Sequence, residues 1–245
     1  ALGEPGNVVI EDAAHLAALQ AWAKAGTANG TQCWVQLNHP GKQAPRGLNH
    51  ESVAPSAVPF RDDLKAFFAT PRALTGAEVR ALVARFGKAA GIVKQAGFTG
   101  VQIHGAHGYL VSQFLSPHHN LRTDEWGGSP EKRRRFLMEV YRAIRKATGA
   151  GFPIGIKLNS ADFQRGGFTE EESLDTIRAL AHAGIDLIEI SGGTYESPAM
   201  TGVKSGREPA RESTRQREAY FLEFAEKARA AGVDIELEVE EVGRA

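Results

Sequence analysis

Two histidines and a tyrosine follow a short apolar segment and could act together on one small acceptor atom. The segment Gly100–Pro117 reads GVQIHGAHGYLVSQFLSP, with His104 and His107 three residues apart and Tyr109 just beyond them. Glycines on either side of the second histidine allow the backbone to bend there at low steric cost. Imidazole and phenol groups donate hydrogen bonds or protons, so the cluster suits an acceptor such as a carbonyl oxygen.

The residues alone leave several interpretations of this cluster open. His104 and His107 could bind a substrate, cap the end of a strand structurally, or ligate a metal, since two imidazoles are common metal ligands. No nearby carboxylate or cysteine completes an obvious zinc set. Tyr109 could donate a proton, or it could be a packed aromatic residue whose hydroxyl is satisfied.

A glutamine and a lysine also stand in apolar segments where polar side chains need a reason. Gln36 comes late in the segment TQCWVQL. Its amide suits a ligand edge that carries both donors and acceptors, and the alternative is a buried core glutamine. Lys157 lies between Ile156 and Leu158, where an unpaired charge would be costly. It could stabilise an anion, or pair with a carboxylate such as Glu189.

The elements that must position these residues alternate along the chain. Helix patterns cover residues 12–25, 75–96, 129–149, 169–184 and 217–231, and strand patterns cover residues 31–37, 100–104, 153–158 and 186–191. Residues 233–239 could form a fifth strand, although apolar residues alternate with Glu there. Capping boxes at Thr75–Glu78 and Thr169–Glu172 open two of the helices.

This alternation predicts parallel strands joined by right-handed crossovers. The polar and glycine-rich stretches mostly follow strands, as at the carboxyl-terminal face of an α/β barrel where active sites lie. The long polar segment 38–72 is typical of a loop that carries function or covers a site. We therefore predict an α/β protein that forms a (β/α) barrel or a large part of one.

Composition narrows the class of protein further. The 245 residues are 42% hydrophobic and 24% charged with zero formal net charge, which argues against a strongly basic nucleic-acid surface. No apolar run is long enough to cross a bilayer, and no signal-peptide pattern opens the chain. Cys33 is the only cysteine, which fits a cytoplasmic protein. The chain opens on Ala, almost directly in a helical pattern, so we expect that its beginning is missing.

Four segments, in this order, resemble the Old Yellow Enzyme family, the NADH:flavin oxidoreductases. They are QLNHPGK (36–42), HGAHGYL followed by FLSP (104–117), NLRTDEWGGS (120–129) and IEISGG (188–193). The resemblance covers roughly residues 7–230. It implies a TIM (β/α)8 barrel with FMN at the carboxyl ends of its strands. This chain would begin just before the third strand and stop near the seventh, as a single partial flavin-binding barrel domain over residues 1–245.

The resemblance also implies roles for the residues singled out above. It implies an FMN-dependent ene reductase that uses NAD(P)H as reductant and acts on a small molecule with an activated alkene, such as an enone. His104 and His107 would bind the carbonyl oxygen, and Tyr109 would give a proton to the α-carbon. Gln36 and Lys157 would contact the flavin, with lysine at a position where the family often has arginine. We expect no metal, nucleic-acid or membrane partner, and a homo-oligomer is possible.

The end of the chain departs from the family pattern. Family members hold the FMN phosphate with glycine-rich, basic loops after strands seven and eight, whereas residues 232–245 read GVDIELEVEEVGRA and are acidic. Carboxylates at Glu236, Glu238, Glu240 and Glu241 would repel a phosphate. One alternative is therefore a truncated, inactive barrel fragment without flavin, whose open sheet edges associate. Another is a metal-dependent barrel enzyme that uses His104 and His107.

Overall fold

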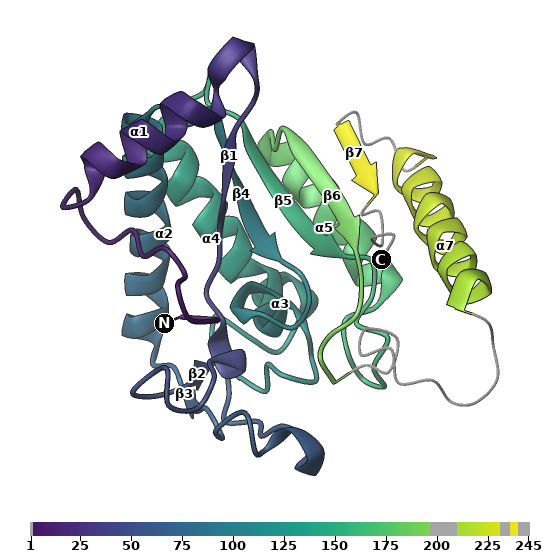
Figure 1. Ribbon diagram of the computed structural model, residues 1–245. Helices are drawn as coiled ribbons and strands as arrows, with labels where there is room; N and C mark the ends of the chain where they lie inside the picture. The colour runs from purple at the N-terminus through teal and green to yellow at the C-terminus, as the bar shows by residue number, and fades with distance from the viewer. Residues whose placement is uncertain (1, 197–209, 231–235, 240–245) are drawn as a thin grey trace.

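A five-stranded parallel sheet forms the centre of the protein in the computed structural model (Figure 1), which describes residues 2–196, 210–230 and 236–239. The strands follow one another across the sheet in chain order: β1 (Trp34–Leu37), β4 (Gly100–Gly105), β5 (Ile154–Asn159), β6 (Leu187–Ser191) and β7 (Glu236–Val239). Every neighbouring pair is parallel. This sequential order is the strand arrangement of a partial (β/α) barrel, as the sequence predicted.

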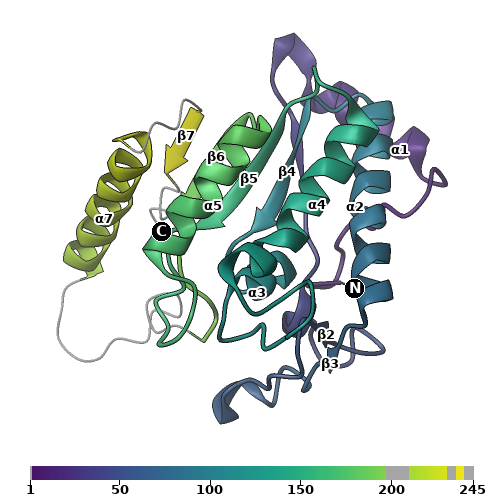
Figure 2. The same ribbon diagram turned by 180° about the vertical axis from the view of Figure 1, so that it is seen from behind.

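Helices cover one face of this sheet. The longer helices are α1 (Leu16–Gly26), α2 (Gly76–Ala96), α4 (Pro130–Thr148), α5 (Glu170–Ala183) and α7 (Ala210–Ala230), and the short helix α3 (Leu110–Leu115) follows β4. α4 and α5 lie behind the strands in Figure 1 and in front of them in Figure 2, and α2 packs beside α4.

Loops gather at the carboxyl ends of the strands, toward which the arrows point in Figure 1. The long segment after β1 contains short 3-10 helices, η2 (Gly41–Gln43) and η3 (Asp62–Leu64), and the two-stranded sheet of β2 (Val53–Ala54) and β3 (Arg72–Ala73). A further 3-10 turn, η1 (Ala28–Gly30), precedes β1. The segment predicted to carry function thus lies at the same end of the sheet as the residues that follow β4.

Local sequence signals set the helix ends. The Thr75 side chain accepts from the Glu78 amide at 3.2 Å while the Glu78 carboxylate accepts from the Thr75 amide at 2.7 Å. The predicted box at Thr169 forms in the same way. Both boxes satisfy amides that would otherwise lack partners in the first helical turn. They were predicted correctly because a capping box depends only on residues three apart.

Alternation along the strands divides core from site. Val101, Ile103, Ile156 and Ile188 are completely buried. Polar residues alternate with these buried ones and face the other side of the sheet. They are Gln102 and His104 on β4, Lys157 on β5 and Glu189 on β6. Near the amino ends of the strands, Trp34 takes the space that side chains would fill on neighbouring strands: a Cβ built at Gly100 would lie 2.4 Å from its ring, and one at Gly155 would lie 3.0 Å away.

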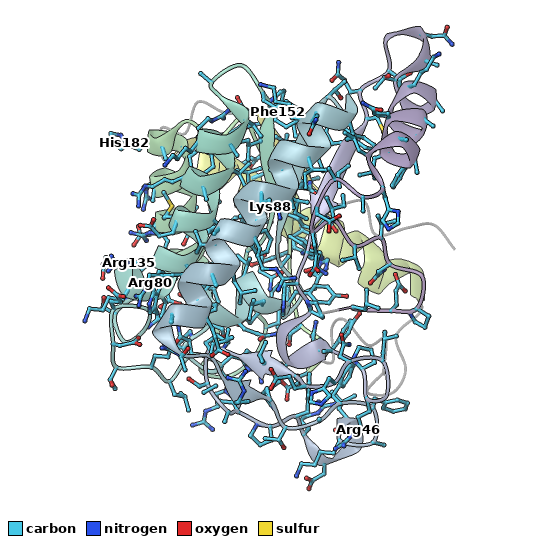
Figure 3. The ribbon with its side chains drawn as sticks, turned by 90° about the vertical axis from the view of Figure 1, so that its left-hand side faces the viewer. Arg46, Arg80, Lys88, Arg135, Phe152 and His182 are labelled. Carbon is cyan, nitrogen blue, oxygen red and sulfur yellow. The ribbon has the colours of Figure 1, made fainter. Side chains whose placement is uncertain are left out.

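The outer helical face carries ordinary ion pairs. Figure 3, viewed from the side of α2, shows Arg80 and Arg135 close together at this face. Both guanidinium groups contact the Glu125 carboxylate, at 2.9 and 3.3 Å. Such exposed pairs contribute little to stability.

Most predicted elements are confirmed, and the differences have local causes. The first helix begins at Leu16 instead of residue 12, because the Asp12 carboxylate accepts from the Ala14 amide and favours a turn there. The last helix begins at Ala210, earlier than predicted, and its predicted end at residue 231 lies outside the described residues. β7 does form beside β6. No helix of the described chain is long and apolar enough to cross a membrane.

Candidate active site

His104, His107 and Tyr109 come together at the carboxyl end of β4. The ring centroid of His104 lies 5.2 Å from that of His107 and 4.7 Å from that of Tyr109. His107 has a φ of 61°, a left-handed conformation that is unusual for a residue other than glycine. Its amide donates to the Asn159 side chain, at the end of β5, at 3.1 Å. The neighbouring strand thus supports a strained backbone that aims this side chain.

Each imidazole has a partner that bears on where its proton lies. The Nδ1 atom of His104 accepts from the Ala106 amide at 3.4 Å, so the neutral ring carries its proton on Nε2. The Nε2 atom of His107 lies 2.5 Å from the Ser191 hydroxyl at the end of β6. His104 is almost fully buried, with 6% of its surface exposed. His104 can therefore donate a hydrogen bond through Nε2 in its neutral form.

Tyr109 has a second phenol beside it. Its hydroxyl lies 3.0 Å from the hydroxyl of Tyr195, which belongs to the segment after β6. Burial, followed by the hydrogen bond with Tyr195, raises the pKa of Tyr109 well above its usual value of about 10. Tyr109 therefore stays protonated at any physiological pH.

A row of polar side chains crosses the sheet on the face away from the helices. Gln36 on β1 donates to Gln102 on β4 at 2.6 Å, and Gln102 donates to Glu189 on β6 at 2.7 Å. Glu189 also contacts Lys157 on β5 at 2.9 Å. The sequence offered two interpretations of Lys157, and its pairing with Glu189 is observed.

Behind the tyrosines, a buried ion pair joins the loops after β1 and β6. The ammonium of Lys42 lies 3.0 Å from the Glu196 carboxylate, and the two side chains are only 2% and 5% exposed. The ammonium also approaches His119 Nδ1 at 3.4 Å and lies 4.1 Å from the centre of the Phe60 ring. Burial lowers the pKa of Lys42, and Glu196 partly opposes that shift. Because Glu196 directly follows Tyr195 in the chain, the ion pair anchors the backbone beside Tyr195.

A cavity of about 710 Å³ opens beside these groups. Its polar lining includes Gln36, His104, Tyr109 and Tyr195, and its apolar lining includes Trp34 and Leu37. Residues 2–4 and 7–11 of the N-terminal segment line one side of the cavity. The volume falls within the range of small-molecule and cofactor pockets. Neither Lys157 on β5 nor His107, which follows β4, lines this cavity.

The interpretation of His104 and His107 as metal ligands requires further ligands close to them. Across the described ranges, no three His, Cys, Asp or Glu side chains are grouped so that they could hold a metal ion. The polar groups on and after the strands in this region are two imidazoles, two phenols, two amides and one lysine paired with a glutamate. Such a set suits an organic ring system with carbonyl and N–H groups along its edge.

Three contributors were missed by reasoning from sequence: Tyr195, Gln102 and the Lys42–Glu196 pair. Tyr195 lies directly after the glycines and threonine that follow β6, and that position was a usable signal. Gln102 lies two residues before His104, so strand alternation places both on one face. The ion pair spans 154 positions, and nothing local announces it.

Comparisons with known proteins agree with this geometry. Residues 2–227 match the sequence profile of the NADH:flavin oxidoreductase / NADH oxidase family. The chain is 39% identical over 236 residues to the NADH-dependent flavin oxidoreductase iliE of Neonectria sp. (strain DH2), covering 90% of this chain and 30% of that protein. It is 34% identical to an NADPH dehydrogenase of Geobacillus sp. (strain WCH70), covering 94% of this chain and 65% of that protein.

Solved structures give the same result. A 2-naphthoyl-CoA reductase complex superposes with a TM-score of 0.83 at 30% identity, covering 97% of this chain and 36% of that one. An old yellow enzyme homologue from Zymomonas mobilis superposes with a TM-score of 0.73 at 25% identity, covering 97% and 70%. The fold is therefore that of part of an α/β barrel oxidoreductase. The chain belongs to the NADH:flavin oxidoreductase / NADH oxidase family, the Old Yellow Enzyme family.

The chain spans only part of most of these relatives, from 30% to 63% of the first three curated ones. Flavin and a nicotinamide nucleotide are the cofactors that the family name implies.

Proposed function

We propose that the protein carrying this chain is an FMN-dependent ene reductase, with residues 1–245 forming one partial flavin-binding barrel domain. The observation that supports the proposal is the cluster of His104, His107 and Tyr109, in which His104 and Tyr109 line the same cavity as Gln36. Two hydrogen-bond donors and one proton donor at a single point are what the reduction of an activated alkene requires.

The described residues fit the flavin ring. The side chain of Gln36 is exposed on the sheet face, and within the described residues its Oε1 atom has no hydrogen-bond donor. Such an amide suits the mixed donors and acceptors of a pyrimidine edge. Lys157 supplies a cation on the same face for the anionic character that this edge gains on reduction. When bound, FMN would take hydride from NAD(P)H and supply it to the substrate.

The chain's own residues would then act on the substrate. His104 and His107 would donate hydrogen bonds to the carbonyl oxygen, where negative charge grows as the β-carbon gains hydride. Tyr109 would transfer its phenolic proton to the α-carbon, which completes a net addition of two hydrogens across the double bond. Tyr195 would stabilise the phenolate left on Tyr109 by a hydrogen bond and hand on a replacement proton. An enone such as 2-cyclohexenone is the substrate class that these groups suit.

Three variants of the protein carrying this chain test the assignment. The variant with both His104→Ala and His107→Ala should retain FMN and lose enone turnover, because the carbonyl oxygen loses both donors. Each lost donor of this kind is worth about 100- to 1,000-fold in turnover. Tyr109→Phe should keep enone binding. An exposed control, Glu226→Gln on α7, should behave as the wild type.

Two outcomes would reject the proposal. Unchanged turnover in the double histidine variant would show that these donors do not act on the substrate. A colourless, self-associating wild type that takes up no FMN would instead favour the alternative of an inactive barrel fragment.

A further inference from the structure

The row of polar side chains across the sheet has a fixed direction. Its members are Gln36, Gln102 and Glu189, with Lys157 on a branch, and all lie on the face opposite the helices. The Gln36 amide nitrogen lies 2.6 Å from the Gln102 oxygen, and the Gln102 nitrogen lies 2.7 Å from one Glu189 oxygen. The other Glu189 oxygen holds Lys157 at 2.9 Å.

The chemistry of the three groups permits only one arrangement. An ionised carboxylate accepts hydrogen bonds and donates none, so Gln102 must turn its NH2 group toward Glu189. The Gln102 oxygen then faces β1, where it can only accept, and Gln36 must turn its own NH2 group toward it. The Gln36 oxygen is the end left to face the cavity.

We infer that Glu189 and Gln102 are positioning residues that orient the Gln36 amide, so that it presents an acceptor to a ring N–H of the bound ligand. The inference rests on the proposed function, since the pyrimidine edge of FMN carries one N–H between two carbonyl groups. An amide without such a row can turn either end toward the ligand, and only one end pairs with an N–H. The row removes that ambiguity before the ligand binds.

The two branches from Glu189 can be separated by substitution. Glu189→Gln disturbs both Lys157 and Gln102, because both contact the carboxylate. Gln102→Met cuts only the branch to Gln36 and leaves the Lys157–Glu189 pair intact. Methionine is close to glutamine in length and has no amide to orient its neighbour. Gln102→Met is therefore the sharper variant.

The experiment measures the FMN dissociation constant for the wild type, Gln36→Leu, Gln102→Met and the double variant, in the protein carrying this chain. Gln102→Met should weaken FMN binding about 2- to 12-fold, the range that one net hydrogen bond is worth. In the Gln36→Leu background, the same change should alter the constant by less than about 2-fold, because no amide remains to orient. The flavin midpoint potential of Gln102→Met should stay at the wild-type value.

Controls separate this inference from a general loss of structure. Gln95→Met, on the exposed side of α2, should leave FMN binding unchanged. Circular dichroism reports whether each variant is folded. If Gln102→Met does not fold, Gln102→Lys replaces it: a donor-only side chain turns the Gln36 oxygen away from the cavity and should weaken binding at least as much.

The outcomes distinguish the inference from the proposed function. Equal weakening by Gln102→Met with and without Gln36 means that Gln102 acts independently, and it overturns the inference alone. So does wild-type affinity in Gln102→Met. A wild type that binds no FMN overturns the proposed function and the inference together.

Discussion

Replacing Glu196 with glutamine should destabilise the protein strongly, because it leaves the Lys42 ammonium buried without its counter-charge. Removing one partner of a buried ion pair costs about 3–5 kcal/mol. Here the ammonium keeps the Pro59 carbonyl at 3.3 Å and the Phe60 ring at 4.1 Å, and the side-chain oxygen of the introduced glutamine could still accept from the Arg61 amide. These remaining contacts place the expected loss at the lower end, about 3 kcal/mol.

Urea unfolding followed by circular dichroism measures this loss. With a slope of about 3 kcal/mol per molar urea, the midpoint should fall by about 1 M. The exposed control Glu226→Gln should change stability by no more than about 0.5 kcal/mol. Lys42→Met combined with Glu196→Gln should regain most of the loss, since no unpaired charge remains. A single Glu196 variant that unfolds at the wild-type midpoint, or a double variant less stable than the single one, would refute this reasoning.

His119 is 2% exposed, and burial, followed by the charge of Lys42, holds its pKa well below 6.5. Its contribution to stability is therefore full above pH 6.5 and is lost as the pH falls below that value. The free energy of unfolding, measured between pH 7 and 5, should fall by up to about 1.4 kcal/mol per pH unit, and His119→Gln should reduce this slope. Gly100→Ala should cost about 1–3 kcal/mol in thermal unfolding, because its Cβ would lie 2.4 Å from the Trp34 ring, whereas Gly151→Ala, which meets nothing within 4 Å, should cost far less. Tyr109→Phe should lower enone turnover about 100- to 10,000-fold while flavin reduction by NAD(P)H stays unchanged, and equal losses in both half-reactions would contradict its role as proton donor.

The parts predicted from sequence are those that depend on neighbours in the chain. The capping boxes and the strand that carries His104 need only local spacing, and both are present, although β4 extends one residue further, to Gly105. The pairing of Lys157 with Glu189 could also be anticipated, because the two residues hold equivalent positions on adjacent parallel strands. The short helix α3 was missed because its six residues contain too few turns to show a helical period.

The parts that sequence could not supply depend on loops meeting in space. Tyr195 reaches Tyr109 across 86 positions, and Lys42 reaches Glu196 across 154. Neither contact has a periodic pattern, since both arise where the carboxyl ends of different strands meet. Only part of the polar row on the sheet was predicted from the sequence. Gln36 and Lys157 were named as site residues, whereas the Gln102 that joins Gln36 to Glu189 was not.

The central claim is that His104 and His107 bind an activated alkene next to a flavin held on this sheet, and that Tyr109 protonates it. The most direct test reduces the FMN-loaded protein with NAD(P)H under anaerobic conditions, adds 2-cyclohexenone and follows the visible flavin absorption. We predict that the absorption returns in proportion to the enone added, with cyclohexanone as product, and that it does not return when both histidines are alanine. Flavin that stays reduced in the wild type, or reoxidises equally fast in the double variant, would contradict this claim.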